Sequence, residues 1–405
     1  MSVSQNKEKT GFKMSRTQLL GLCLVIAILF IDMLLYSIVI PIIPHFEKML
    51  SPSATMLGVL FASYAVALFL ATPFFGPLCD KIGRRTPIII GLIGMAISTI
   101  MFAYAETMLM LIVARFVQGI AAAATWTAAL AFLADIFPGT MRGTAMGMAL
   151  TGISTGSLMG APLGGWLFEY GGTKLPFFFT GGLTLLTALL VVFFMKEPLR
   201  EKEESMGTFH LLRNKSVVFI ACVILLAEIS MTLLEPVLPV FLDAKFEFSP
   251  AMIGFVFGAM TLTYGLSAPI AGTLAGKRNP FIIMLIGIGC LALSLPLLVF
   301  SSTLWQVLAS AAVVGALIGF TLSPTLATLG ILVDQDEQGG YGAAYALFNM
   351  FHAVGIILGP LIGGVLTDFM EVPTAVIAVS TAILIVVAIL SAVLKWKLPK
   401  WQGVR

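Results

Sequence analysis

Charged residues are scarce in this chain. Asp, Glu, Lys and Arg make up only 11% of its 405 residues, whereas hydrophobic residues make up 59%. An average soluble domain carries roughly 25% charged residues. A soluble protein of this composition would have to expose much of its apolar surface, a problem that a bilayer removes because it is itself an apolar solvent. The composition excludes an ordinary soluble domain and predicts an integral membrane protein.

The sequence also has few residues of the kinds that build metal sites or disulfide frameworks. It holds four cysteines, each in or beside an apolar run and without the spacing of a disulfide framework or a metal site: Cys23, Cys79, Cys222 and Cys290. We expect all of them to pack inside helices. Pairs of metal ligands at helical spacing are lacking, as is a nucleophile beside a general base. The sequence therefore argues against an enzyme and predicts no bound cofactor, no metal and no nucleic-acid partner.

Long polar segments are lacking as well. The first sixteen residues are polar and basic, and the apolar run after them is too long for the core of a signal peptide. We interpret that run as the first membrane helix. The connections between later runs are short and leave little room for a soluble domain. The longest connection, at 196–215, is highly charged and divides the chain near its middle.

What the chain does have is a series of long apolar runs. A helix needs about 20 apolar residues to cross the hydrocarbon core of a bilayer. The sequence predicts twelve such helices, at 18–43, 57–77, 87–105, 108–133, 143–167, 175–195, 216–241, 250–273, 281–300, 303–331, 341–365 and 373–395. The predicted fold class is an all-α membrane protein with twelve transmembrane helices.

Lys and Arg residues gather on one side of the predicted membrane. With twelve spans both termini share a side, and 19 of the 23 basic residues fall there. Lys48, Lys174 and Lys245 fall on the opposite side, and Arg115 lies within a span. Because basic residues favour cytoplasmic loops, we expect both termini to be cytoplasmic.

The two halves of the chain resemble each other at an offset of 195 to 199 residues. Pro41 and Pro44 match Pro236 and Pro239, and Glu169 falls opposite Asp368. The remaining matches are Gly58, Pro73, Gly76 and Lys81 with Gly254, Pro269, Gly272 and Lys277, then Gly156, Gly160, Gly164 and Gly165 with Gly355, Gly359, Gly363 and Gly364. Parallel repeats predict two pseudo-symmetric bundles with a substrate site between them near the midplane, exposed to alternate sides by rocking.

This repeat gives the expected division of the chain. We predict a cytoplasmic tail at 1–17, a six-helix bundle at 18–195, a cytoplasmic linker at 196–215, a second six-helix bundle at 216–395 and a cytoplasmic tail at 396–405.

Three motifs resemble those of the major facilitator superfamily. Gly76–Arg85 resembles its signature loop between helices two and three, Arg115–Gly119 its helix-four motif, and Gly156–Gly165 the helix-five motif of its proton antiporters. The resemblance covers the whole chain and implies the major facilitator fold. It also implies that Asp80, Arg84 and Asp135, at cytoplasmic helix ends, form a salt-bridged gate that latches the bundles when the cavity faces outward. The alternative is ordinary charge that sets topology.

A closer resemblance is to the vesicular amine transporters and their bacterial drug-exporting relatives. Asp32, nine residues before Pro41, resembles the acid of their first helix, and the stretch around Glu235 resembles their seventh. Phe61 and Tyr264 fall where that family has aromatic residues lining its site. The resemblance implies a small organic cation as substrate and a proton gradient as the energy source.

The chain departs from that family at several positions. Tyr64 stands in place of a lysine on helix two, while Gly319 and Asn349 stand in place of acids on helices ten and eleven. The loop after the first helix is short. These differences favour a prokaryotic exporter of the plasma (inner) membrane over a vesicle protein.

Three acids interrupt apolar runs: Asp32, Glu228 and Glu235. A carboxylate in the middle of a membrane costs about 2.5–3.5 kcal/mol on insertion scales, so it needs a partner or a function. We predict that Asp32 binds a proton or the ammonium of a substrate, unless it only forms a hydrogen bond inside one bundle. Glu228 and Glu235, two turns apart, are expected to share one helix face, one as proton coupler and the other as cation partner. The proline after Glu235 predicts a bend there.

Further candidates surround these acids. His352 and Arg115 are predicted to join the proton-coupling site, with polar packing and bonding to neighbouring carbonyls as the respective alternatives. Asn349 is expected to face the cavity. Aromatic residues that offer a cation–π surface, or that simply face lipid or core, are Tyr36, Phe61, Tyr64, Trp126 and Tyr264.

The favoured function is proton-driven export of organic cations, such as aromatic monoamines and cationic drugs or dyes, by a monomer in a lipid bilayer. Two alternatives stay open. A uniporter or symporter of a neutral solute predicts transport independent of pH once Asp32 or Glu235 is neutralised. A non-transporting receptor predicts ligand binding without accumulation in proteoliposomes.

Overall fold

The computed structural model describes residues 14–137, 139–197, 213–334 and 341–397, and within these ranges every regular element is a helix. Eleven spans in these ranges are long and apolar enough to cross a membrane. The twelfth is α6 (Gly139–Gly171), which is less apolar because glycine, serine and threonine dilute its hydrophobic residues. Its 33 residues nevertheless extend about 50 Å, more than the roughly 30 Å of a hydrocarbon core. The predicted all-helical fold of twelve spans is confirmed.

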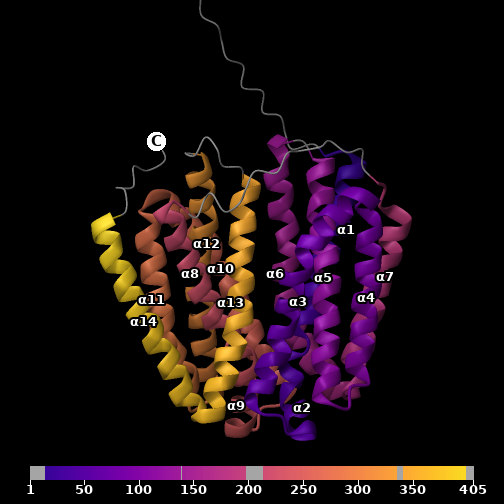
Figure 1. Ribbon diagram of the computed structural model, residues 1–405. Coiled ribbons are helices and arrows are strands. Elements are labelled where there is room, and N and C mark those ends of the chain that lie inside the picture. Colours follow the sequence, from indigo (N-terminus) through magenta and orange to yellow (C-terminus); the bar gives the residue numbers. More distant parts are fainter. Residues whose placement is uncertain (1–13, 138, 198–212, 335–340, 398–405) are drawn as a thin grey trace, which may run out of the picture.

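The helices form two groups that follow the two halves of the sequence (Figure 1). The first half consists of α1 (Arg16–Ser37), the 3-10 turn η1 (Ile40–Ile42), α2 (Ile43–Leu50), α3 (Ala54–Ile82), α4 (Arg85–Ala103), α5 (Met108–Ile136), α6 and α7 (Lys174–Phe194). The second half consists of α8 (Lys215–Thr232), α9 (Leu234–Phe246), α10 (Pro250–Lys277), α11 (Pro280–Phe300), α12 (Leu304–Asp334), α13 (Tyr341–Phe369) and α14 (Val372–Lys397). Most of the predicted tails and linker lies outside the described residues, so those boundaries stay predictions.

Prolines break the first span of each half. α1 ends at Ser37, and Pro41 and Pro44 stand in the first turns of η1 and α2. α8 ends at Thr232, and Pro236 stands in the first turn of α9. Proline lacks the N–H that would continue a helical ladder, but a first turn does not need it. Each of the predicted spans 18–43 and 216–241 is therefore a single membrane span built from consecutive helices, and the interruption at Leu233 lies where a bend is predicted beside Glu235.

Serine caps begin two helices that the repeat relates to each other. The Ser53 hydroxyl accepts a hydrogen bond from the Met56 backbone N–H at 3.2 Å, and Ser249 accepts one from Met252 at 3.4 Å. Each cap satisfies one of the N–H groups that a helix leaves unpaired at its first turn. The repeat thus extends from helix packing to helix initiation.

Glycines allow α6 and α13 to lie directly against the broken spans. A Cβ atom at Gly156 would collide with the Phe30 carbonyl oxygen on α1, and one at Gly359 with the Thr232 side chain on α8. Gly355 lies in the same way against the Cβ of Glu228. Small residues permit such close approach between membrane helices, so the close packing predicted from the glycine repeats is confirmed.

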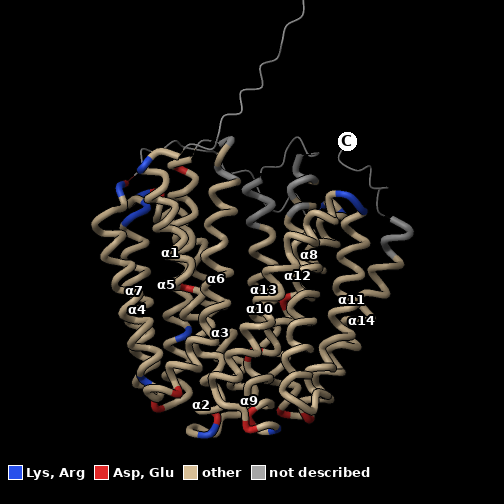
Figure 2. The backbone as a smooth tube through the Cα atoms, turned by 180° about the vertical axis from the view of Figure 1, so that it is seen from behind, with Lys and Arg blue, Asp and Glu red and all other residues tan. Residues whose placement is uncertain are grey.

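The halves meet near α2 and α9, at the lower end of Figure 1. There Gly58 of α3 lies against Pro360 of α13, and Gly165 of α6 lies against Pro250 of α10. We call this the α2/α9 end, and the opposite end, which holds Arg84, the Arg84 end. Figure 2 shows Lys and Arg gathered at the Arg84 end, acidic and basic residues together at the α2/α9 end, and few charges between.

Candidate functional site

Four charged side chains are buried in the described part of the chain: Asp32, Arg115, Glu228 and Glu235. All four belong to spans that are long and apolar enough to cross a membrane. Three carboxylates and one guanidinium would carry an excess of two negative charges with every carboxylate ionised and His352 neutral. Ionisable groups inside a membrane are costly and mark functional sites by default. We therefore take these groups and their partners as the candidate site.

Asp32, on α1, is bound inside the first half. Its Oδ2 atom accepts hydrogen bonds from the Tyr64 hydroxyl at 2.8 Å and from Trp126 Nε1 at 2.6 Å. Its Oδ1 atom is buried and has no hydrogen-bond partner in the described structure. Because a buried acceptor without a partner is unfavourable, this oxygen offers a binding position to a proton or to a ligand N–H group.

Arg115, on α5, bonds to neutral groups of the same half. It donates hydrogen bonds to the Tyr36 carbonyl oxygen at 2.8 Å and to Gln118 Oε1 at 2.9 Å. Its guanidinium lies 4.9 Å from the ring centroid of Tyr36 and 5.4 Å from that of Phe61, within cation–π range. Phe61, predicted to line the substrate site, is fully buried in this group of side chains.

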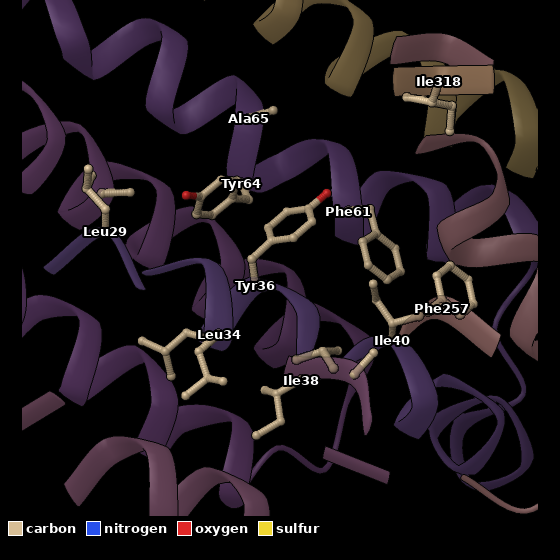
Figure 3. Packing of buried hydrophobic residues seen from close by; sticks show 14 of the residues in the cluster. Leu29, Leu34, Tyr36, Ile38, Ile40, Phe61, Tyr64, Ala65, Phe257 and Ile318 are labelled. Carbon is tan, nitrogen blue, oxygen red and sulfur yellow. The ribbon is translucent and has the colours of Figure 1, made fainter. Parts of the chain in front are cut away.

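Glu235, on α9, is bonded across the two halves. The Tyr36 hydroxyl of α1 donates a hydrogen bond to Glu235 Oε2 at 2.6 Å, and both side chains are buried. The hydroxyl of a neighbouring tyrosine, Tyr64, binds Asp32 instead. Tyr36 and Tyr64 lie with their ring centroids 5.0 Å apart (Figure 3). Two tyrosines in contact with each other therefore donate hydrogen bonds to acids of different halves.

Glu228, on α8, pairs with a histidine of its own half. Its Oε1 atom lies 2.9 Å from Nδ1 of His352, whose ring stacks on Phe348. Glu228 is buried, whereas 37% of the His352 side chain is exposed. Asn349 is exposed on the same helix, one turn earlier, and Tyr264 of α10 is half-buried.

The two glutamates lie on either side of the helix interruption at Leu233, whose backbone keeps right-handed helical dihedral angles. Glu228 contacts His352, whereas Glu235 contacts Tyr36. The shared helix face of the two acids stays a prediction. The structure brings together Asp32, Arg115 and Glu235 around Tyr36 and Tyr64, and Glu228 with His352.

The predicted gate residues form a cluster at the Arg84 end. Arg84 donates to Asp80 Oδ1 at 2.6 Å and to Asp135 Oδ2 at 2.8 Å, and all three residues belong to the first half. Burial alone would lower the pKa of Arg84, but the hydrogen bonds to Asp135 and Asp80 outweigh it and raise that pKa. The cluster exists within one half, and its latching of the two halves stays a prediction.

Two carboxylates that sequence reasoning did not assign to the machinery connect the halves at the α2/α9 end. Glu169 of α6 accepts a hydrogen bond from the Ala251 backbone N–H of α10 at 3.0 Å. Asp368 of α13 accepts from the Ala54 and Thr55 N–H groups of α3 at 2.8 and 3.0 Å. Each carboxylate meets the positive end of a helix in the other half. The internal repeat, which matches Glu169 with Asp368, is the sequence signal that could have identified this pair.

An apolar hollow of about 710 Å³ lies apart from this site. It is bordered by α6, α10 and α12, with Trp166, Phe255 and Leu308 among its lining residues, and it contains none of the buried acids. Trp166 and Phe255 are largely exposed in the isolated chain, as expected of side chains that face lipid. The hollow therefore belongs to the outer surface of the bundle.

Comparison with known proteins gives the family. A sequence model of the Major Facilitator Superfamily matches residues 25–227 and 220–404. The chain is 32% identical to the chromaffin granule amine transporter of Rattus norvegicus over 80% of this chain and 63% of that protein. It is 31% identical to multidrug resistance protein 1 of Bacillus subtilis (strain 168) over 84% of this chain and 88% of that protein. The chain thus spans less than two thirds of the amine transporter's length.

Solved structures agree on the fold. A bacterial homologue of the human lysosomal transporter Spinster, in an inward-facing and occupied conformation, superposes with a TM-score of 0.82 at 15% sequence identity, covering 95% of this chain and 98% of that one. The family consists of transporters and not enzymes, as the sequence predicts. With nearly its whole length matched and relatives above 30% identity, the chain belongs to the major facilitator superfamily.

Proposed function

We propose that this protein is a proton-coupled antiporter that exports small organic cations by alternating access. The observation that carries the proposal is the unbalanced charge of the site. Among the described residues, three carboxylates but a single guanidinium are buried, and that guanidinium bonds to neutral groups. Charges that are taken out of water must be paired or neutralised. Protons and an organic cation can both supply the missing positive charge, and competition between them is the basis of exchange.

Asp32 and Glu235 are the groups for which a proton and a cation compete. Asp32 offers a buried oxygen without a partner, and the aromatic rings of Tyr64 and Trp126 lie beside it. Aromatic faces attract ammonium groups when water is excluded. A lipophilic amine would place its charge on the carboxylate and its apolar body on the rings. Glu228 with His352 is a second position for a proton.

The conformation supports alternating access. In the described structure the halves are connected at the α2/α9 end by Glu169 and Asp368 and by an ion pair of 2.6 Å between Lys48 and Asp243. With the termini in the cytoplasm, as the distribution of Lys and Arg predicts, this end faces outward and the halves are connected on that side. Rocking that breaks these contacts would expose the same acids to the outside.

The names of the relatives support the substrate class. One is an amine transporter and another a multidrug resistance protein. An organic cation suits both names and also the excess of negative charge in the site. Sequence departures such as Tyr64 and the short loop after the first helix favour the exporter of a prokaryotic inner membrane.

Uptake of a fluorescent organic cation into everted membrane vesicles tests the proposal. An imposed pH gradient, acidic inside, should drive uptake by the native protein, and Asp32→Asn and Glu235→Gln should abolish that dependence. Glu106→Gln, a change of an exposed acid between α4 and α5, serves as the matched control and should behave as native. Uptake by the native protein that ignores the gradient would favour the uniporter. Binding without any uptake would favour the receptor.

A further inference from the structure

We propose that Tyr36 is a positioning residue that makes the charge of Glu235 depend on how the two halves are arranged, and so ties proton binding to the transport cycle. This role rests on the proposed antiport function and depends on the hydroxyl group of Tyr36. From the sequence, Tyr36 is predicted only as part of an aromatic cation–π surface.

The hydrogen bond between Tyr36 and Glu235 connects the two halves. Tyr36 belongs to α1 in the first half and Glu235 to α9 in the second, and the hydroxyl meets the carboxylate at 2.6 Å. In the described part of the chain, the other polar contacts between the halves involve exposed or partly buried groups at the α2/α9 end, at Asp368, Glu169 and Lys48. Among these contacts, the one between Tyr36 and Glu235 is the one in which both side chains are buried.

The hydroxyl groups of Tyr36 and Tyr64 point in opposite directions, although the two rings lie next to each other (Figure 3). Tyr64 bonds to Asp32 within the first half, so rocking of the halves leaves that bond intact. Tyr36 bonds across the halves, so rocking must break its bond. The two otherwise similar tyrosines therefore differ in their response to the transport cycle.

The Tyr36 residue is in contact with several groups of its own half. Arg115 donates to the Tyr36 carbonyl oxygen and lies over its ring, and Phe61 packs edge-on against the same ring at 6.4 Å between centroids. These contacts all come from the first half. They hold the hydroxyl in place for Glu235 when the halves close at the α2/α9 end.

The charged and titratable groups around Glu235 come from both halves. From the first half, Tyr36 forms a hydrogen bond with Glu235 and Arg115 attracts its charge. From α8 of the second half, Glu228 repels that charge. Glu228 is itself paired with His352 of α13, and farther along α9 Asp243 is paired with Lys48 of α2. Tyr36 is the group among these that donates a hydrogen bond directly to Glu235.

The consequence for the cycle follows from the chemistry of the bond. A hydrogen bond donated to an ionised carboxylate stabilises the ionised form. In the conformation closed at the α2/α9 end, Tyr36 therefore favours loss of a proton from Glu235 toward the Arg84 end. When the halves separate, Glu235 loses this donor and binds a proton or an organic cation from the other side in its place. Proton binding and conformation are thereby linked reciprocally.

The test is the variant Tyr36→Phe, reconstituted in proteoliposomes with tetraphenylphosphonium as the probe. Exchange of labelled for unlabelled probe at equal pH should persist, because Asp32 and Glu235 are both intact. Accumulation driven by a pH gradient should fall about tenfold or more, the factor in an equilibrium constant that corresponds to one hydrogen bond to a charged group. Its dependence on external pH should flatten. Tyr104→Phe, the same change on an exposed tyrosine of the first half, is the control and should match the native protein.

A second variant covers the case in which Tyr36→Phe is not recovered in membranes. Tyr36→Met also removes the hydroxyl while it keeps a large apolar side chain at this buried position, and it should show the same selective loss of gradient-driven accumulation. Native accumulation and an unchanged pH profile in either variant would overturn the role of Tyr36 while leaving antiport standing. Equal loss of exchange and accumulation would mean a purely structural role. Absence of gradient-driven accumulation in the native protein would instead overturn the antiport function itself.

Discussion

The two halves of the molecule share one architecture but differ in the charges that they bury. Among the residues that the structure describes, the first half buries one carboxylate, Asp32, and one guanidinium, Arg115. The described residues of the second half bury two carboxylates, Glu228 and Glu235, and the partly exposed His352 is the cationic partner found for Glu228 there. With all carboxylates ionised and His352 neutral, the buried charges of the first half cancel, whereas those of the second half sum to two negative charges. The second half therefore has the greater need of a proton or a cation.

The two bundles have closely similar backbones because of the repeat, but their buried side chains differ. The matched prolines, serine caps and glycines give each half the same broken span and the same close helix pairs. The halves differ in the hydrogen-bond partners of their buried acids. The first half holds its acid with Tyr64 and Trp126, whereas the second half depends on Tyr36 of the first for the partner of Glu235.

The largest effect is expected from removing charge in the second half. Glu235→Gln should reduce gradient-driven uptake of an organic cation to the level of vesicles without the protein, because the group that exchanges a proton for the cation is gone. The measurement is uptake into everted vesicles with and without an imposed pH gradient. Gradient-driven uptake that survives in Glu235→Gln would show that the imbalance of the second half is not what couples the protons.

A smaller effect is expected from the acid of the first half. Asp32→Asn keeps the hydrogen-bonding shape but loses the charge, and should weaken equilibrium binding of tetraphenylphosphonium by about 1.5–3 kcal/mol, or tenfold and more in Kd. Binding to purified protein by calorimetry checks this value. A Kd equal to the native one would remove Asp32 from the cation site and leave it as a structural acid of the first bundle.

A matched pair of glycine variants sharpens the comparison further. Gly355→Ala places a methyl group against Glu228, and Gly156→Ala places one against the backbone of α1. Each should destabilise the protein by about 1–3 kcal/mol through overpacking, seen as a lower Tm. Only Gly355→Ala should also shift the pH profile of uptake, because it alone displaces an acid. Gly182→Ala, where the added methyl group meets open space, is the control.

The smallest effect is expected from the carboxylates that connect the halves. Glu169→Gln and Asp368→Asn each remove a charge from the positive end of a helix, an interaction of about 0.3–1 kcal/mol. Each should shift the population toward conformations open at the α2/α9 end by a few-fold. Spin labels at Met49 and Ala244, exposed on α2 and α9, would report this shift as a longer distance. Equal effects of the two variants would show that the two caps are equivalent.

Much of this fold could be predicted from the sequence, because hydrophobic length and the repeat are strong local signals. The glycine and proline matches placed the close helix pairs and the bend beside Glu235 correctly. The different partners of Glu228 and Glu235 could not be predicted, because spacing along a chain does not show which side chains of other helices meet each acid. The Arg115 contacts show the same limit: its partners are a carbonyl oxygen and Gln118, which only tertiary packing can select.

The residues of the site were easier to name than to pair. An acid in an apolar run is conspicuous, and all three acids are buried. Their partners are tyrosines, a tryptophan and a histidine, all of them candidates in the sequence, but the sequence does not show which partner binds which acid. Tyr36 is the clearest case, because its role depends on a contact between residues 199 positions apart in the chain.

The most direct test of the account is whether binding of an organic cation expels protons. Purified protein in weakly buffered detergent solution should release protons into the medium when tetraphenylphosphonium is added, and Glu235→Gln should release fewer. This result is expected if the cation takes the place of protons on the buried carboxylates. Tight binding of the cation to the native protein with no change in the pH of the medium would contradict it.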